Sequence, residues 1–104
     1  MPFVFFTTLA IKDEAETHST QSEIFRFSVQ TGMPTYLPAI NVLQVYQDGS
    51  EGRFKRLWFP EQDKAWIWEC PNPVKALYAH KLRLKLWRVS LATPIIIQVE
   101  EYRP

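Results

Sequence analysis

The side chains best suited to nucleophilic or metal chemistry in this chain are few and widely spaced. Cys70 is the only cysteine, and His18 and His80 are the only histidines. A zinc site needs three or four protein ligands, often at short spacings such as CxxC, and the sequence has no such spacing. Cys70 and His80 could form a nucleophilic pair, but Cys70 ends an aromatic segment, where a buried structural thiol is expected. We therefore expect no metal site and no cofactor.

Motifs for acyl or phosphoryl transfer are also missing from the sequence. No serine lies in a GxSxG elbow, and no glycine-rich loop is available to bind phosphate. Asp13, Glu14 and Glu16 are close together, but carboxylates without apolar neighbours are typical of solvated surface rather than of an acid–base pair. The sequence therefore predicts a protein that is not an enzyme and has no catalytic residues.

A basic face alternates with an apolar face in residues 81–91, KLRLKLWRVSL. Three leucines alternate there with three cations: Leu82, Leu84 and Leu86 with Lys81, Arg83 and Lys85. This period of two predicts a β-strand. The apolar positions change parity at Trp87, which indicates either a bulge or a chain that passes into a second packing environment.

Basic side chains among aromatic ones on a β-surface are typical of proteins that bind single-stranded nucleic acid. The basic candidates are Lys81, Arg83, Lys85, Arg53, Lys55 and Arg56, and Trp58, Trp66, Trp68 and Trp87 could stack on bases. The alternative is a solvated strand face that discourages edge-to-edge association. The sequence pI of 7.9 is also far below that of a dedicated nucleic-acid binder.

Aromatic residues and arginine are also the residues enriched at the centres of protein–protein interfaces. The segment Trp66-Ile67-Trp68 has apolar side chains on both strand faces, so at least one should be exposed, and we expect Trp66 or Trp68 to be an anchor. A loop with three bulky apolar residues between prolines is a second candidate: Met33, Tyr36 and Leu37. The sequence thus favours a small non-enzymatic accessory or adaptor protein that docks on a protein partner, with single-stranded nucleic-acid binding as the alternative.

The sequence predicts that these residues are positioned by an all-β, mainly antiparallel fold. Apolar or alternating runs predict strands over residues 3–11, 23–30, 41–47, 53–59, 65–70, 81–91 and 95–102. Residues 3–11 are apolar at both parities, as in a strand covered on both sides, and residues 12–22 and 31–38 are expected to be loops. Asn72-Pro73 predicts one short helix near residues 73–79. The predicted architecture is a small barrel or sandwich of about seven strands.

The turn-forming residues 48–52 predict a hairpin between the third and fourth strands. We expect a register that places large apolar side chains opposite each other on one face, with Tyr46 opposite Phe54 and Val42 opposite Trp58.

The last two strands are expected to form a second hairpin. Leu91 opposite Ile95 gives three apolar pairs and places Lys85 opposite Glu101, so four pairs agree on one register.

Length and composition bound the remaining choices. The 104 residues fit one domain, and a hydrophobic fraction of 46% with 22% charged residues is that of a globular protein. The lone cysteine fits a reducing compartment. The N-terminal apolar run lacks a preceding basic region and is too short to span a bilayer, so a cytoplasmic protein without membrane association is expected.

The net charge of +1 is unevenly distributed along the chain. Residues 1–52 hold two basic and six acidic side chains, a charge of −4, and residues 53–88 hold nine basic and three acidic ones, a charge of +6. This asymmetry indicates either a surface that faces a polyanion or two parts that neutralise each other in the fold.

Overall fold

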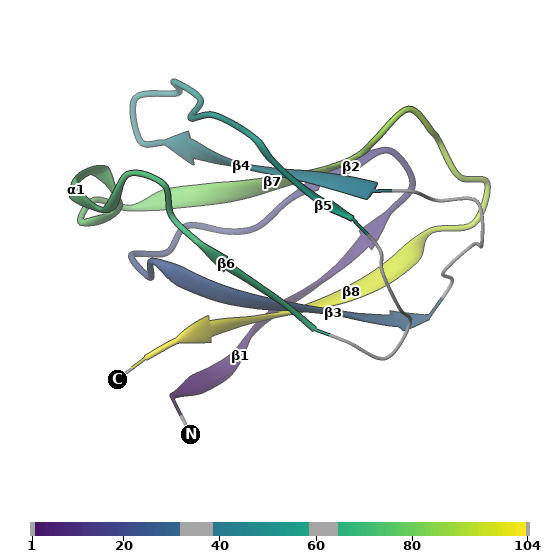
Figure 1. The fold of residues 1–104 in the computed structure, drawn as a ribbon, viewed down its shortest axis with the longest axis horizontal. Helices are drawn as coiled ribbons and strands as arrows, with labels where there is room; N and C mark the ends of the chain where they lie inside the picture. The colour runs from purple at the N-terminus through teal and green to yellow at the C-terminus, as the bar shows by residue number, and fades with distance from the viewer. Residues whose placement is uncertain (1, 32–38, 59–64, 104) are drawn as a thin grey trace.

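Two four-stranded antiparallel sheets face each other in the computed structural model, which describes residues 2–31, 39–58 and 65–103 (Figure 1). The elements are β1 (Phe3–Ile11), β2 (Glu14–Glu16), β3 (Ile24–Thr31), β4 (Ala39–Tyr46), β5 (Lys55–Trp58), β6 (Trp66–Glu69), α1 (Pro73–Ala76), β7 (His80–Leu86) and β8 (Ile95–Tyr102). One sheet has the strand order β1-β8-β3-β6, and the other has the order β2-β7-β4-β5. The all-β prediction is confirmed, and the architecture is the sandwich rather than the barrel.

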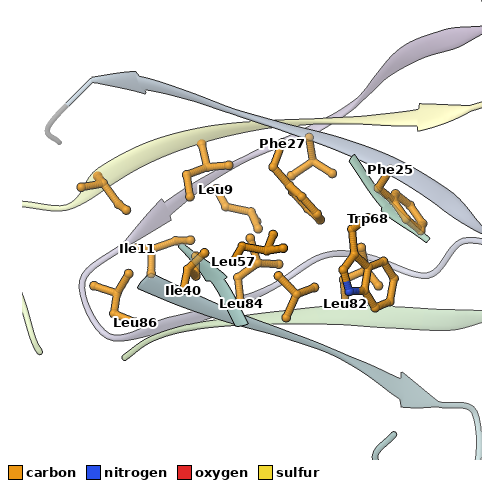
Figure 2. Close-up of a cluster of buried hydrophobic side chains, with 14 of the residues drawn as sticks. Leu9, Ile11, Phe25, Phe27, Ile40, Leu57, Trp68, Leu82, Leu84 and Leu86 are labelled. Carbon is orange, nitrogen blue, oxygen red and sulfur yellow. The ribbon is translucent and has the colours of Figure 1, made fainter. Parts of the chain in front are cut away.

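Alternating apolar side chains of the two sheets form the core. Leu82, Leu84 and Leu86 of β7 are buried, while Lys81 and Lys85 between them are exposed. Figure 2 shows these leucines pointing into the space between the sheets, together with aromatic side chains from β3 and β6. The period-two prediction for this strand is therefore confirmed. Burial of each such leucine stabilises the fold by about 2 kcal/mol.

The strands β7 and β8 lie in different sheets, so the hairpin expected between them is wrong. β7 pairs with β2 and β4, whereas β8 pairs with β1 and β3. Lys85 thus lies opposite Glu14 and Asn41, not opposite Glu101. Apolar residues that face one core from two sheets show the same alternation as residues paired within one sheet, and the pattern alone cannot distinguish the two arrangements.

The connection from β7 to β8 explains the change of apolar parity at Trp87. β7 ends at Leu86, the residue before Trp87, and Trp87 donates its backbone N–H to the carbonyl of Ala39 at 3.1 Å. Arg88 has a φ of 62°, a left-handed conformation that redirects the chain toward the other sheet. Beyond this turn Val89 packs against the core and Leu91 is buried in it. Of the two expected explanations, a second packing environment is the one found.

The hairpin between β4 and β5 forms, but in another register. Gly49 donates its N–H to the carbonyl of Tyr46 at 2.9 Å, so the turn starts earlier than residues 48–52. Val42 consequently lies opposite Lys55 instead of Trp58, a shift of three residues. The expected register is wrong because the local turn geometry, rather than the pairing of large apolar side chains, sets the alignment.

Three smaller expectations also differ from the structure. β1 is an edge strand and is not covered on both sides, since Phe5 is 62% exposed. The expected loop of residues 12–22 contains β2 and a bridge between Thr20 and His80. The helix is limited to Pro73–Ala76, and Asn72 makes no side-chain capping hydrogen bond.

Candidate interaction surface

Five side chains gather on the outside of the second sheet, beside its edge strand β5. They are Phe54, Arg56, Trp58, Trp87 and Arg88, called here the aromatic–arginine cluster. Phe54 precedes β5, Arg56 and Trp58 belong to it, and Trp87 and Arg88 begin the crossover after β7. Phe54 and Trp58 are 55% and 54% exposed, which distinguishes them from the aromatic side chains of the core.

Trp87 is the centre of this cluster. The guanidinium carbon of Arg56 lies 4.1 Å from the centroid of the Trp87 ring, and that of Arg88 lies 4.7 Å from it. Trp58 meets Trp87 edge to face, with 5.3 Å between the ring centroids. Arg56 also donates its Nε–H to Asn41 Oδ1 at 3.0 Å. Cation–π and edge-to-face contacts each contribute about 0.5–1 kcal/mol at exposed sites, so the cluster holds its side chains in place.

Five of the six arginines in the described part of the chain fall into two groups by their partners, and Arg53 belongs to neither group. Arg26, Arg83 and Arg103 form ion pairs with Glu100, with Glu16 and Glu51, and with Glu101, respectively. Arg56 and Arg88 instead contact aromatic rings and have no carboxylate partner among these residues. The cluster therefore carries two positive charges that its described surroundings do not neutralise.

The other residues expected to bind nucleic acid do not form a continuous basic track. Lys81 and Lys85 are exposed on β7, but Arg83 between them is bound by two glutamates. Those two ion pairs join the basic and acidic parts of the sequence, as the second interpretation of the charge asymmetry expected. Arg53 and Lys55 are exposed near Arg56, on the far side of β4 from β7.

The residues expected to anchor a protein partner are in several environments. Trp68 is fully buried in the core, which excludes it from a surface. Trp66 is half-buried and donates its Nε1–H to the carbonyl of Trp58 at 2.9 Å, joining the edge strands of the two sheets. Ile67 is 53% exposed, so one apolar side chain of this segment does lie at the surface. Met33, Tyr36 and Leu37 lie outside the described residues.

The sequence argument missed a second exposed apolar group, called here the α1 knob and formed by Val74, Leu77 and Tyr78. These side chains are 73%, 67% and 66% exposed, and α1 lies at one end of the sandwich (Figure 1). Val74 belongs to α1, and Leu77 and Tyr78 directly follow its last residue. The three residues are visible in the sequence, but whether they are exposed depends on where the helix lies in the fold.

Cys70 and His80 do not form a catalytic pair. Burial, with smaller contributions from Glu23 and Glu69, raises the pKa of the Cys70 thiol to about 12, so the thiol is protonated at neutral pH. His80 is buried, with Nε2 2.9 Å from the carbonyl of Ser22 and Nδ1 3.4 Å from the amide nitrogen of Gln44. Since a carbonyl only accepts, Nε2 carries the proton and Nδ1 accepts from the amide. Both ring nitrogens therefore have structural partners.

A groove of about 1050 Å3 contains the buried carboxylate of Glu101 in its wall. Ser22 and Thr20 donate their hydroxyl groups to Oε1 at 2.7 and 2.8 Å, and Arg103 donates to Oε2 at 2.7 Å. Burial alone would raise the pKa of Glu101, but these hydrogen bonds outweigh it and hold the pKa below its ordinary value. The carboxylate is thus ionised and satisfied by the protein itself, which gives it a structural role.

Neither a metal-binding cluster nor a membrane-spanning helix is found in residues 2–31, 39–58 and 65–103. No three His, Cys, Asp or Glu side chains come together there in a way that could hold a metal ion. No helix in these ranges has the length and apolar character needed to cross a bilayer. The chain matches no protein-family model, and comparisons with curated proteins and with solved structures returned no match.

Proposed function

We propose that this protein is a small accessory or adaptor protein that docks on a protein partner through the aromatic–arginine cluster. The observation that carries the proposal is Trp58, a tryptophan more than half exposed and in contact with Trp87 and Arg56. Tryptophan and arginine are prominent among the residues that supply most of the binding energy of protein interfaces. A side chain already held in place loses little conformational entropy on binding.

The test immobilises the wild-type protein and two variants and exposes each to a lysate of the cells in which the protein occurs naturally. The captured proteins are then compared. Trp58→Ala removes the proposed anchor, and Tyr78→Ala removes a comparably exposed aromatic ring from the α1 knob. The proposal expects a set of proteins, retained after nuclease treatment, that binds the wild type and Tyr78→Ala but is lost with Trp58→Ala. For a purified partner, Trp58→Ala should weaken binding about 30-fold, a loss of about 2 kcal/mol.

Identical capture by all three proteins would remove the aromatic–arginine cluster from the proposal. Because Trp58 is exposed, the variant should keep the thermal unfolding midpoint of the wild type within a few degrees, which separates loss of binding from loss of fold.

Single-stranded nucleic-acid binding is the second candidate, and one observation favours it. Arg56 and Arg88 lie over the same indole ring, next to the exposed face of Trp58, and base stacking on such a ring is worth about 1–3 kcal/mol. A fluorescent 15-nucleotide thymidine oligonucleotide should then bind at low salt, with the affinity falling by about 0.7 log units per log unit of salt for each neutralised phosphate. Absence of binding at low salt removes this candidate, since electrostatic attraction is strongest there.

A further inference from the structure

We infer that the partner presents an acidic peptide segment to the aromatic–arginine cluster, with carboxylates that bind Arg56 and Arg88 beside a large apolar side chain that packs on Trp58. This inference rests on the proposed docking function and specifies the chemistry of the partner.

The first step is the state of the two guanidinium groups. Arg56 uses its Nε–H on Asn41 and presents one face to Trp87. A guanidinium has five N–H donors in its plane, so stacking on Trp87 does not use the remaining four donors of Arg56. Within the described chain these donors make no hydrogen bond, whereas Arg26 is satisfied by both oxygens of Glu100 at 2.8 and 3.0 Å. Arg56 can therefore bind a carboxylate through Nη1 and Nη2, whereas Arg26 binds Glu100 through Nε and Nη2.

The second step is the apolar contact. Phe54 and Trp58 flank Arg56, with their ring centroids 5.5 and 5.9 Å from its guanidinium carbon, and both are more than half exposed. A ligand that places a carboxylate on Arg56 thus has aromatic surface within one residue length on either side. A peptide with an acidic residue next to a large apolar one matches this arrangement, whereas a free carboxylate would leave the rings uncovered.

The charge distribution favours a peptide over a nucleic acid. A bound strand must neutralise several successive phosphates, but the basic row of β7 is interrupted where Arg83 is bound by Glu16 and Glu51. Lys85 lies opposite Glu14 on the neighbouring strand. Beside Trp58, the cations without a carboxylate partner in the described chain are Arg56 and Arg88, with Arg53 and Lys55 exposed nearby. A local group of this size is suited to a short acidic segment.

The test selects peptides from a random 12-residue phage-displayed library on the immobilised wild-type protein, and then measures synthetic peptides by fluorescence anisotropy. The inference expects enriched sequences with Asp or Glu beside Trp, Phe, Tyr or Leu. Arg56→Gln and Arg88→Gln should each weaken binding about tenfold or more. Lys81→Gln, which removes the same charge from an exposed position of β7 away from the cluster, should change it less than twofold.

Two results would overturn the inference. One of them leaves the proposed docking function in place, and the other refutes it as well. Neutral apolar peptides that lose binding with Trp58→Ala but not with Arg88→Gln would refute the acidic partner and leave docking through the cluster in place. If no peptide depends on either arginine while the 15-nucleotide thymidine oligonucleotide binds and loses affinity in the same variants, the ligand is nucleic acid and docking on a protein fails as well. Arg88 is exposed, so Arg88→Gln keeps the test decisive even if Arg56→Gln is unstable.

Discussion

Arg88 combines an unfavourable backbone conformation with a contact on the exposed cluster. Its φ of 62° lies in the left-handed region, which costs a residue other than glycine about 1–2 kcal/mol. Residues held in such conformations are concentrated at functional sites, where the geometry matters more than the local energy. Here the conformation places the Arg88 guanidinium over the Trp87 ring. The strain is consistent with a position kept for binding rather than for stability.

Replacement of Arg88 tests this separation of stability from binding. Arg88→Gly should be about 1 kcal/mol more stable than Arg88→Ala, because glycine adopts a positive φ without penalty while alanine keeps the strain. Both variants lose the guanidinium and should lose affinity for the acidic peptides to the same extent. Urea unfolding measures the first difference and fluorescence anisotropy the second. Equal stabilities of the two variants would show that the backbone at this position relaxes.

Glu101 should make the stability of the protein depend on pH. Its folded pKa is lowered from the ordinary value of 4.5, so its contribution is complete above about pH 4.5 and is lost as the pH falls through the folded pKa. Glu101→Gln should cost about 2 kcal/mol at pH 7, the scale of hydrogen bonds to a buried charge. The stability difference between the variant and the wild type should shrink below pH 4.5. Urea unfolding curves between pH 3 and 7 measure it, and a constant difference would contradict the assignment.

The position of β7 in its sheet can be tested by exchanging charges. Lys85 and Glu14 are opposite each other and exposed, so Lys85→Glu combined with Glu14→Lys should recover part of the loss of each single variant. The coupling should be about 0.3 kcal/mol, as expected for an exposed cross-strand pair. Lys85→Glu combined with Glu69→Lys is the matched control, because Glu69 is an exposed strand residue of the other sheet, and this pair should show no coupling. Absence of coupling between Lys85 and Glu14 would contradict the pairing of β7 with β2.

At the level of elements, the alternation of apolar and polar side chains within a strand was predictable from the sequence, whereas the pairing of strands was not. The buried faces around Phe25, Phe27 and the leucines of β7 followed from the period of two, because each strand has one face toward the core. The partner of a strand depends on residues far away in the sequence, so the hairpin of β7 with β8 and the register of β4 with β5 were both wrong. A short strand such as β2, three polar residues paired with β7, carries almost no signal of its own.

The sequence predicted which residue types form the candidate site, namely arginine and tryptophan, but not which individual residues come together. Arg56, Trp58 and Trp87 belonged to the expected nucleic-acid set, but that set also contained Arg83, which is occupied by glutamates, and Trp68, which is buried. Four tryptophans look equivalent in a sequence. Their exposure is decided by the side of the sheet on which they fall and by the strand that covers them.

For the molecule as a whole, the pairing of β1 with β8 brings the two ends of the described chain together (Figure 1). Arg103 donates its backbone N–H to the carbonyl of Pro2. A circular permutant that joins the ends by a short linker and opens the chain between Asp48 and Gly49, in an exposed turn, should therefore fold. Circular dichroism and cooperative urea unfolding check this. A permutant opened between Ile97 and Gln98, inside β8, should not fold, and failure of the first permutant would contradict the prediction.

The same strand pairing has a consequence for synthesis on the ribosome. β8 lies between β1 and β3, so the first sheet has a gap at its centre until residue 102 has been made. The second sheet needs only residues up to 86, but the sheet that its inner leucines pack against lacks its central strand until β8 has been made. At about 5–20 residues per second, the sixteen residues after β7 take roughly one to three seconds to add. During that interval the nascent chain contains the core residues of β1, β3 and β7 without the strand that joins β1 to β3, so their apolar surface is available to a chaperone.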